Sequence, residues 1–161
     1  MKIRLFHHAD HAACLKIFDS NFPRYFDVDE RAPFEKWLSH QADAENPYSS
    51  PTYQNVDKEV YYVAEDLNGE IVGCGGFYII KAQKEARLAW GMIHSGKHGT
   101  GIGSALFQHR ANAIRKEWPG FQITLGTSQH TYPFYEKMGM KVVQMIPKGY
   151  GPDLDRYDMV L

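Results

Sequence analysis

The sequence predicts an α/β protein with one mixed sheet, and two observations lead to this prediction. Residues 60–93 alternate extended apolar runs with polar turns, which is typical of an antiparallel meander. Residues 86–126 follow the order strand, glycine-rich turn, helix and strand, and such a crossover normally joins parallel strands. We therefore expect a largely antiparallel N-terminal half joined to a parallel β-α-β unit, all within a single domain over residues 1–161.

The first part of the chain predicts a strand and two helices. The strand is expected over residues 2–6. The helix that follows has Asp10 as its N-cap and ends at Pro23, which cannot continue a helix. A second helix is expected over residues 31–40, where apolar side chains recur at helical spacing.

A long loop is expected over residues 43–57, which are polar, include Pro47 and Pro51 and lack periodicity. Loops of this length are uncommon unless they have a function or are disordered. Tyr48 and Tyr53 could therefore close over a substrate, or the segment could be an ordinary surface loop.

The predicted meander has three strands. They are expected over residues 60–65, 70–80 and 86–93. Residues 66–69 have the sequence Asp-Leu-Asn-Gly, which favours a hairpin turn because glycine and asparagine accept the dihedral angles that tight turns need.

The rest of the chain alternates helices and strands. The expected elements are, in order, a helix over 102–116, a strand over 121–126, a short helix capped by Thr131, a strand over 141–146, a loop rich in Gly and Pro over 147–155 and a closing strand over 156–161. The short helix has Pro133 in its first turn and Gly139 directly after its end, as helix termini often do. Ligands of open α/β sheets bind at the carboxyl ends of parallel strands, which points to the turn after residue 93.

This turn joins the strand that ends near Ile93 to the helix that begins at Ile102, and it is rich in glycine. The arrangement suits a phosphate, because the first N–H groups of a helix have no partner within it and the helix dipole adds partial positive charge. Glycines let the backbone approach a ligand closely. The same stretch could also be a turn that only reverses the chain.

Three phosphate-binding patterns compete for this stretch. Gly91-x-x-x-x-Gly96-Lys97 looks like a P-loop, but His98 follows where a P-loop needs Ser or Thr for its metal ion. A dinucleotide fingerprint would need glycine in place of Ser104 and an acidic residue about 20 residues further on, and the sequence has neither. The third pattern, (Gln/Arg)-x-x-Gly-x-(Gly/Ala), fits residues 98–103 with histidine at its first position.

A second motif lies downstream, over residues 134–139, with the sequence Phe-Tyr-Glu-Lys-Met-Gly. In this order, and together with residues 98–103, it resembles the two signatures of the GNAT superfamily of N-acetyltransferases. The expected order of elements agrees with this resemblance, which therefore covers essentially the whole chain. The first two helices and the loop over 43–57 are the least recognisable part, and in this family that region shapes the choice of substrate.

The resemblance implies that the chain binds acetyl-CoA, and it assigns residues to that contact. Backbone groups of Gly91, Met92 and Ile93 would face the acetyl-pantetheine arm. The residues implied around the pyrophosphate are His98, Gly99, Thr100, Gly101, Ile102, Gly103 and Ser104. Ser128 stands where the family often has an asparagine that contacts the cofactor.

The resemblance gives Tyr135 the role of general acid, and the chemistry agrees with it. Acetyl transfer to an amine expels the thiolate of CoA, whose thiol has a pKa of about 8.5. A phenol with a pKa of about 10 stays protonated at neutral pH and can donate to that sulfur. An N–H group of Met92 or Ile93 would stabilise the oxyanion. Tyr135 could also be an ordinary core aromatic residue.

The general base is left open. Some members of the family use a glutamate on the strand before the glycine turn, but the corresponding position here is about Arg87. Glu85 would share the face of that strand, Glu65 ends an earlier strand and His130 lies near the second motif. Each of these could equally be a solvated residue, and deprotonation through water is a further alternative.

Composition limits the partners. The 161 residues have a formal net charge of −1, so we expect no nucleic acid and no membrane as partner. We also expect no metal, because His7, His8 and His11 lack further ligands at a suitable spacing. Cys14 and Cys74 fit an apolar core as reduced thiols, and the N-terminus lacks the pattern of a signal peptide, which together predict a cytoplasmic protein.

The sequence thus predicts an acetyl-CoA-dependent N-acetyltransferase that acts by direct transfer, in a ternary complex, on a primary amine of a small molecule or peptide. Neither motif contains a cysteine that could form an acyl-enzyme. One alternative is a non-catalytic acyl-CoA sensor on the same fold, since His98 and Ser128 replace the usual residues. The other is a P-loop phosphotransferase. Both a homodimer and a monomer are compatible with the sequence.

Overall fold

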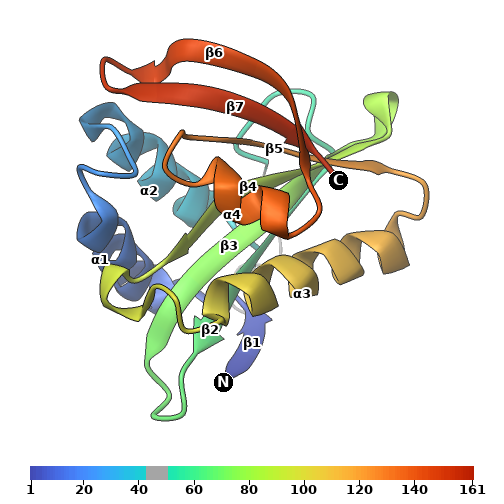
Figure 1. Ribbon diagram of the computed structural model, residues 1–161. Coiled ribbons are helices and arrows are strands. Elements are labelled where there is room, and N and C mark those ends of the chain that lie inside the picture. Colours follow the sequence, from blue (N-terminus) through green and yellow to red (C-terminus); the bar gives the residue numbers. More distant parts are fainter. Residues whose placement is uncertain (43–50) are drawn as a thin grey trace.

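The computed structural model describes residues 1–42 and 51–161, which form one mixed sheet with helices on both faces (Figure 1). The strands are β1 (Lys2–Leu5), β2 (Lys58–Glu65), β3 (Ile71–Ile80), β4 (Glu85–Ile93), β5 (Gln122–Thr127), β6 (Lys141–Gly151) and β7 (Leu154–Val160). The helices are α1 (His11–Asn21), α2 (Arg31–His40), α3 (Ile102–Glu117) and α4 (Tyr132–Lys137), with short 3-10 turns η1 (His8–Asp10), η2 (Val28–Glu30), η3 (Lys81–Gln83) and η4 (Ser95–Lys97).

The strand order is β1-β2-β3-β4-β5-β7-β6, and this seven-stranded sheet confirms the predicted mixed architecture. Strands β1 to β4 pair antiparallel with their sequence neighbours, and β4 pairs parallel with β5. The parallel ladder begins at Glu85 opposite Gln122 and ends at Arg87 opposite Thr124. Beyond that point β4 and β5 separate toward their carboxyl ends, which opens the sheet at its centre.

Two apolar clusters cover the two faces of the sheet. On one face, α3 and α4 pack on the strands through residues such as Leu106, Phe107 and Ile114. On the other face, α1 and α2 bury Phe18 and Trp37 against the sheet, together with Cys14 and Cys74. Both thiols are free and buried, and the hydrogen bond between them and their burial raise the pKa of Cys14. No helix in the described part of the chain has the length and apolar character needed to cross a membrane.

Two predicted helix caps are wrong in their chemistry. Asp10 and Thr131 precede α1 and α4, but neither side chain makes a capping hydrogen bond. The Asp10 carboxylate instead accepts from the backbone N–H of His7 and pairs with the Arg4 guanidinium at 2.7 Å. Its oxygens therefore bond to groups that precede α1 and not to the first N–H groups of that helix.

The C-terminal loop prediction is also wrong. Residues 147–155 were expected as a loop, whereas β6 continues to Gly151 and β7 starts at Leu154, so that a tight hairpin joins two long strands. Pro147 is tolerated because β6 is an edge strand, where a missing N–H breaks no ladder on the open side. Burial of Leu154, at 5% exposure, holds the end of the hairpin.

The packing of β3 against β2 leads to a test of stability. A methyl group on Gly76 would overlap the Val60 carbonyl oxygen and lie 2.6 Å from Cδ2 of Tyr61. Since a paired strand cannot move away, we expect Gly76→Ala to lower the free energy of unfolding by about 3 kcal/mol or more. Gly69→Ala is the control, because its φ of +80° adds only backbone strain in open space, worth about 1–2 kcal/mol. Urea unfolding measures the free energy of unfolding of both variants. An equal loss in Gly76→Ala and Gly69→Ala would contradict this account.

Candidate active site

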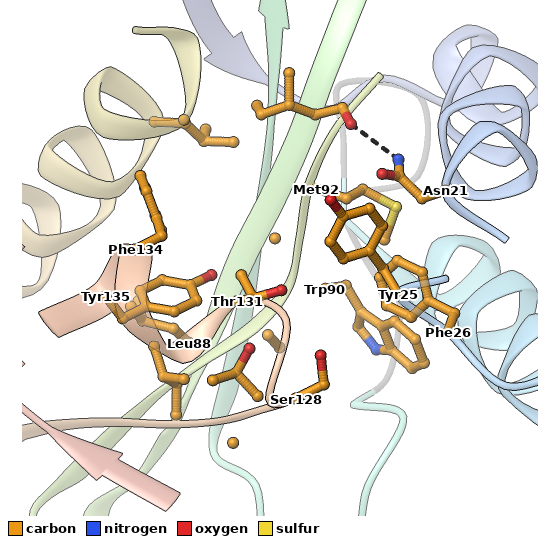
Figure 2. Close-up of a pocket in the computed structure, with 18 of the residues that line it drawn as sticks. Asn21, Tyr25, Phe26, Leu88, Trp90, Met92, Ser128, Thr131, Phe134 and Tyr135 are labelled. Carbon is orange, nitrogen blue, oxygen red and sulfur yellow. Dashed lines mark hydrogen bonds between the residues drawn. The ribbon is translucent and has the colours of Figure 1, made fainter. Parts of the chain in front are cut away.

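A cavity of about 690 Å³ lies where β4 and β5 separate. Its walls come from both faces of the sheet. The glycine turn, the start of α3 and helix α4 line it on one side, and the segment that follows α1 lines it on the other. Figure 2 shows Phe134 and Tyr135 on one side of this space, with Tyr25, Phe26 and Trp90 opposite them.

Strand β4 bulges at the cavity. Ala89 pairs with Gly76 and Met92 with Cys74, so two residues of β4 face a single residue of β3. Trp90, in the bulge, has a φ of +48°, which is unusual for a bulky side chain. The Tyr61 hydroxyl holds this conformation by donating to the Trp90 carbonyl at 3.0 Å. The bulge brings the backbone of Gly91 and Met92 to the cavity wall, where the sequence placed them.

The glycine turn also lies at the cavity, as predicted. Gly99 and Gly101 have φ angles of +76° and +84°, and Gly101 is the N-cap of α3. The cavity is lined here by Lys97, His98, Gly99, Gly101, Gly103 and Ser104. Thr100 and Ile102, which belong to the same predicted set, do not line it. The Thr100 hydroxyl instead donates to the Lys97 carbonyl at 2.7 Å and stabilises the turn.

Ile93 lines the cavity, but its carbonyl oxygen is already occupied by two side chains. Nδ2 of Asn21 donates to it at 2.8 Å (dashed line in Figure 2), and Nε2 of His98 lies 3.0 Å from it. Asn21 is 4% exposed and so fixes the end of α1 to the end of β4. No sequence pattern pointed to this role, because an asparagine shortly before Pro23 looks like an ordinary helix end.

Tyr135 and Ser128, to which the family resemblance assigns the acid role and a cofactor contact, both line the cavity. Tyr135 is 7% exposed, and its ring contacts the rings of Phe107 and Phe134. Its hydroxyl points into the open space between the two walls (Figure 2). Ser128 is 5% exposed and lies at the end of β5, where its carbonyl accepts the N–H of Thr131.

A comparison with protein families identifies this arrangement. The model of the acetyltransferase (GNAT) domain matches residues 57–142, which is more than half of the chain. The chain belongs to the GNAT family. The match includes the bulged strand, the glycine turn and Tyr135. Among curated proteins, none matches the sequence significantly.

Solved structures of GNAT proteins share the fold. Ribosomal-protein-alanine N-acetyltransferase from Brucella melitensis is 19% identical with a TM-score of 0.71, and the match covers 100% of this chain and 99% of that one. A spermidine N-acetyltransferase SpeG chimera from Vibrio cholerae and hSSAT is 13% identical with a TM-score of 0.74, covering 99% and 93%. The yncA structure from Salmonella typhimurium, solved with its cofactor acetyl-CoA, is 18% identical with a TM-score of 0.71, covering 100% and 92%.

Arg110 is a site residue that sequence reasoning missed. It lies on α3, is 2% exposed and lines the cavity of this GNAT domain. Its guanidinium donates to the carbonyls of Leu106 and Gly76, each at 3.3 Å, and forms no ion pair within residues 1–42 and 51–161. The signal was available, because Leu106, Arg110 and Ile114 are spaced as one buried stripe of a helix.

Of the three side chains considered as a base, only His130 lines the cavity. Glu65 pairs with Arg4 at 2.6 Å. Glu85 accepts a short hydrogen bond from the Thr124 hydroxyl and lies 3.6 Å from Arg87, with which it shares a face of β4 as expected. Neither carboxylate reaches the cavity.

A carboxylate that the sequence did not single out does line the cavity. Glu30 ends η2 and is half-buried. Burial raises the pKa of its carboxyl to about 7; the N–H of Asp27, which donates to it at 2.7 Å, opposes the rise, and the charge of Asp27 adds to it. The spacing Asp27-x-x-Glu30 is a capping box, and this pattern was the signal that could have placed Glu30 at a helix start.

Aromatic side chains line much of the same cavity. They include Phe26, Tyr53, Tyr78, Trp90 and Tyr150. Tyr53, one of two tyrosines considered as a cover for the substrate, accepts from Nε1 of Trp90 at 3.3 Å. The other, Tyr48, lies outside the described residues. No group of three or more His, Cys, Asp or Glu side chains suited to a metal ion occurs in the described ranges.

The positive φ angles of the glycine turn lead to a second test. We expect Gly101→Ala to weaken acetyl-CoA binding about tenfold, because a left-handed conformation costs an alanine about 1–2 kcal/mol and the turn would relax away from the ligand. Gly96→Ala is the matched control, since that glycine has no positive φ and a methyl group would meet only His94, at 3.5 Å. Calorimetric titration measures the affinity of both variants for acetyl-CoA. If Gly96→Ala binds acetyl-CoA as weakly as Gly101→Ala, this contradicts the argument.

Proposed function

We propose that this chain is an acetyl-CoA-dependent N-acetyltransferase that transfers the acetyl group directly to a primary amine. The observation that carries the proposal is the single cavity that joins the glycine turn, the bulge of β4 and the Tyr135 hydroxyl. Family membership supports an acetyltransferase, and this cavity supplies the parts that the reaction needs.

The cavity fits acetyl-CoA. The left-handed glycines at 99 and 101 turn backbone toward the start of α3, which suits the pyrophosphate. Where β4 and β5 separate, backbone groups on the facing edges lack a strand partner, and the amides of a pantetheine arm can bond to them in the manner of an added strand. The yncA relative is solved with acetyl-CoA, which agrees with this assignment.

Tyr135 is proposed as the general acid. Its ring is fixed by Phe107 and Phe134, so the hydroxyl is held toward the cavity. A phenol has a higher pKa than a thiol, by about 1.5 units, so it is protonated when the thiolate leaves and can donate to the sulfur. A backbone N–H group of Met92 or Ile93, after the bulge, would stabilise negative charge on the carbonyl oxygen.

Direct transfer requires the acceptor amine and the thioester to be present together. The cavity is lined from both faces of the sheet, so the two substrates can enter from opposite sides. The cavity-lining residues of the described chain include no cysteine, which leaves no thiol for an acyl-enzyme. We further propose that the protein works in the cytoplasm, where Cys14 and Cys74 stay reduced.

Binding of the donor is tested by thermal unfolding. A ligand that binds the native state raises the unfolding midpoint, by about 2.7 kcal/mol of stability at a hundredfold excess over its Kd. We expect acetyl-CoA to raise it and ATP with Mg²⁺ to leave it unchanged. A shift with ATP alone would favour the P-loop alternative and contradict the acetyltransferase assignment.

The acid role is tested by Tyr135→Phe, which removes one oxygen and keeps the ring packing. We expect kcat to fall by about 10²-fold or more, while acetyl-CoA still stabilises the variant. Tyr132→Phe is the control, because Tyr132 lies on the same helix and stacks on Tyr157 outside the cavity. Release of CoA thiol measures turnover, and an unchanged kcat in Tyr135→Phe would remove the assignment. Binding without turnover in the wild-type protein would favour the sensor alternative.

A further inference from the structure

Glu30 is the single acidic side chain among the cavity-lining residues of the described chain. It belongs to the short turn before α2, on the face of the sheet opposite Tyr135. A cavity that accepts an amine has to hold a positive charge, because amines of the lysine type have a pKa of about 10.4 and are protonated at pH 7. A carboxylate at its wall is the natural partner for that charge.

Two carboxylates on the strands of the sheet, Asp158 and Glu85, are already paired with arginines. Asp158 lies 3.4 Å from Arg87 and 2.8 Å from Arg156, and Glu85 lies 3.6 Å from Arg87. These two cations and two anions balance one another. Glu30 is therefore the one carboxylate of the described chain that lines the cavity, and it has no cationic partner there.

The hydrogen bonding of Glu30 leaves one oxygen available. Its Oε2 accepts the N–H of Asp27 at 2.7 Å, which fixes the side chain. Within the described chain, Oε1 has no hydrogen bond and Glu30 has no ion pair. Phe26, four residues earlier, lies 6.5 Å from the Trp90 ring, so the turn that carries Glu30 is anchored to the bulge.

We propose that Glu30 binds the ammonium group of the acceptor and removes its proton, which rests on the acetyltransferase function proposed above. The aromatic side chains that line the same cavity add a second preference, since aromatic faces attract cations and apolar groups. We infer that the acceptor is a primary amine on an apolar or polycationic molecule without a carboxylate beside the amine, which Glu30 would repel.

The reaction balances with the groups present. Glu30 takes one proton from the ammonium, and the free amine forms the C–N bond at the thioester carbon. The C–S bond breaks, and the thiolate takes the phenolic proton of Tyr135. The second nitrogen proton returns to the Tyr135 oxygen, the amide keeps the third, and Glu30 releases its proton to solvent. One proton is released in each turnover.

The environment of Glu30 suits this work. Burial raises the pKa of its carboxyl to about 7, which makes it a stronger base, closer in pKa to the amine, and the carboxyl is mostly ionised only above neutral pH. The titratable and charged groups that face it are Asp27 from its own turn and Tyr150 from β6, with Arg87 and His130 elsewhere on the cavity wall. Burial raises the pKa of Tyr150 to about 12, so that phenol stays neutral.

The test uses Glu30→Gln, because glutamine keeps the acceptor oxygen of the capping box and loses only the charge. With acetyl-CoA and either 2-phenylethylamine or spermidine, we expect kcat/KM at pH 7 to fall about 100-fold. The deficit should shrink toward pH 10, where the amine loses its proton unaided. Asp29→Asn is the control, since this exposed carboxylate of the same turn lies outside the cavity, and it should stay within about twofold of wild type.

Thermal unfolding gives a readout that does not depend on activity. A carboxyl whose pKa is raised on folding stabilises the native state at low pH and loses that contribution as pH rises from its ordinary value toward about 7. Between pH 5 and pH 8, the unfolding midpoint of the wild type should therefore fall relative to the midpoint of Glu30→Gln. A constant difference would contradict the raised pKa of Glu30, and the kinetic comparison then decides its role.

The kinetic outcomes separate the two proposals. Full activity of Glu30→Gln at pH 7, or a loss that is the same at pH 7 and pH 10, overturns the role of Glu30 and leaves the transferase intact. No turnover of either amine by the wild-type protein overturns both.

Discussion

The site depends on one constraint, which is that β4 and β5 pair only from Glu85 to Arg87 of β4. Beyond that point the facing backbone groups need other partners, because unpaired polar groups in a buried place are costly. Side chains satisfy some of them. Tyr61 bonds the Trp90 carbonyl, and Asn21 with His98 occupies the Ile93 carbonyl. The backbone between these two points remains for a ligand, so the same contacts that stabilise the open strand also set the length of the binding edge.

The glycines of the sheet centre have a second consequence. A methyl group on Gly75 would lie 3.1 Å from Nη1 of Arg110, and one on Gly91 would lie 2.9 Å from it. The guanidinium therefore occupies space that these two glycines leave free, directly behind the bulge. The cavity has a cation on the side of α3 and an anion, Glu30, on the side of α2. This polarity favours an anionic donor at one end and an ammonium at the other.

Local patterns pointed to the part of the cavity that is proposed to bind the donor. The glycine turn and Tyr135 each lie within a few residues of their motif, so spacing alone located them, and the bounds of α2 came from helical periodicity. The rest depends on contacts between distant segments. Trp90 reaches a positive φ because of β3 and Tyr61, and no local rule predicts that for a tryptophan. Asn21 and Glu30 have roles only because α1 and η2 pack beside β4, some 60 residues or more away in the sequence.

The two groups proposed for proton transfer therefore lie on different layers. Tyr135 belongs to the α3 and α4 side, whose sequence is recognisable, and Glu30 belongs to the α1 and α2 side, whose sequence is not. The sheet separates them except at the gap between β4 and β5, where the donor and the acceptor are proposed to meet. In this proposal one segment both recognises and deprotonates the acceptor, and it is separate from the residues proposed to hold the donor. Changes around Glu30 can then alter the choice of amine while the glycine turn and the bulge keep their geometry.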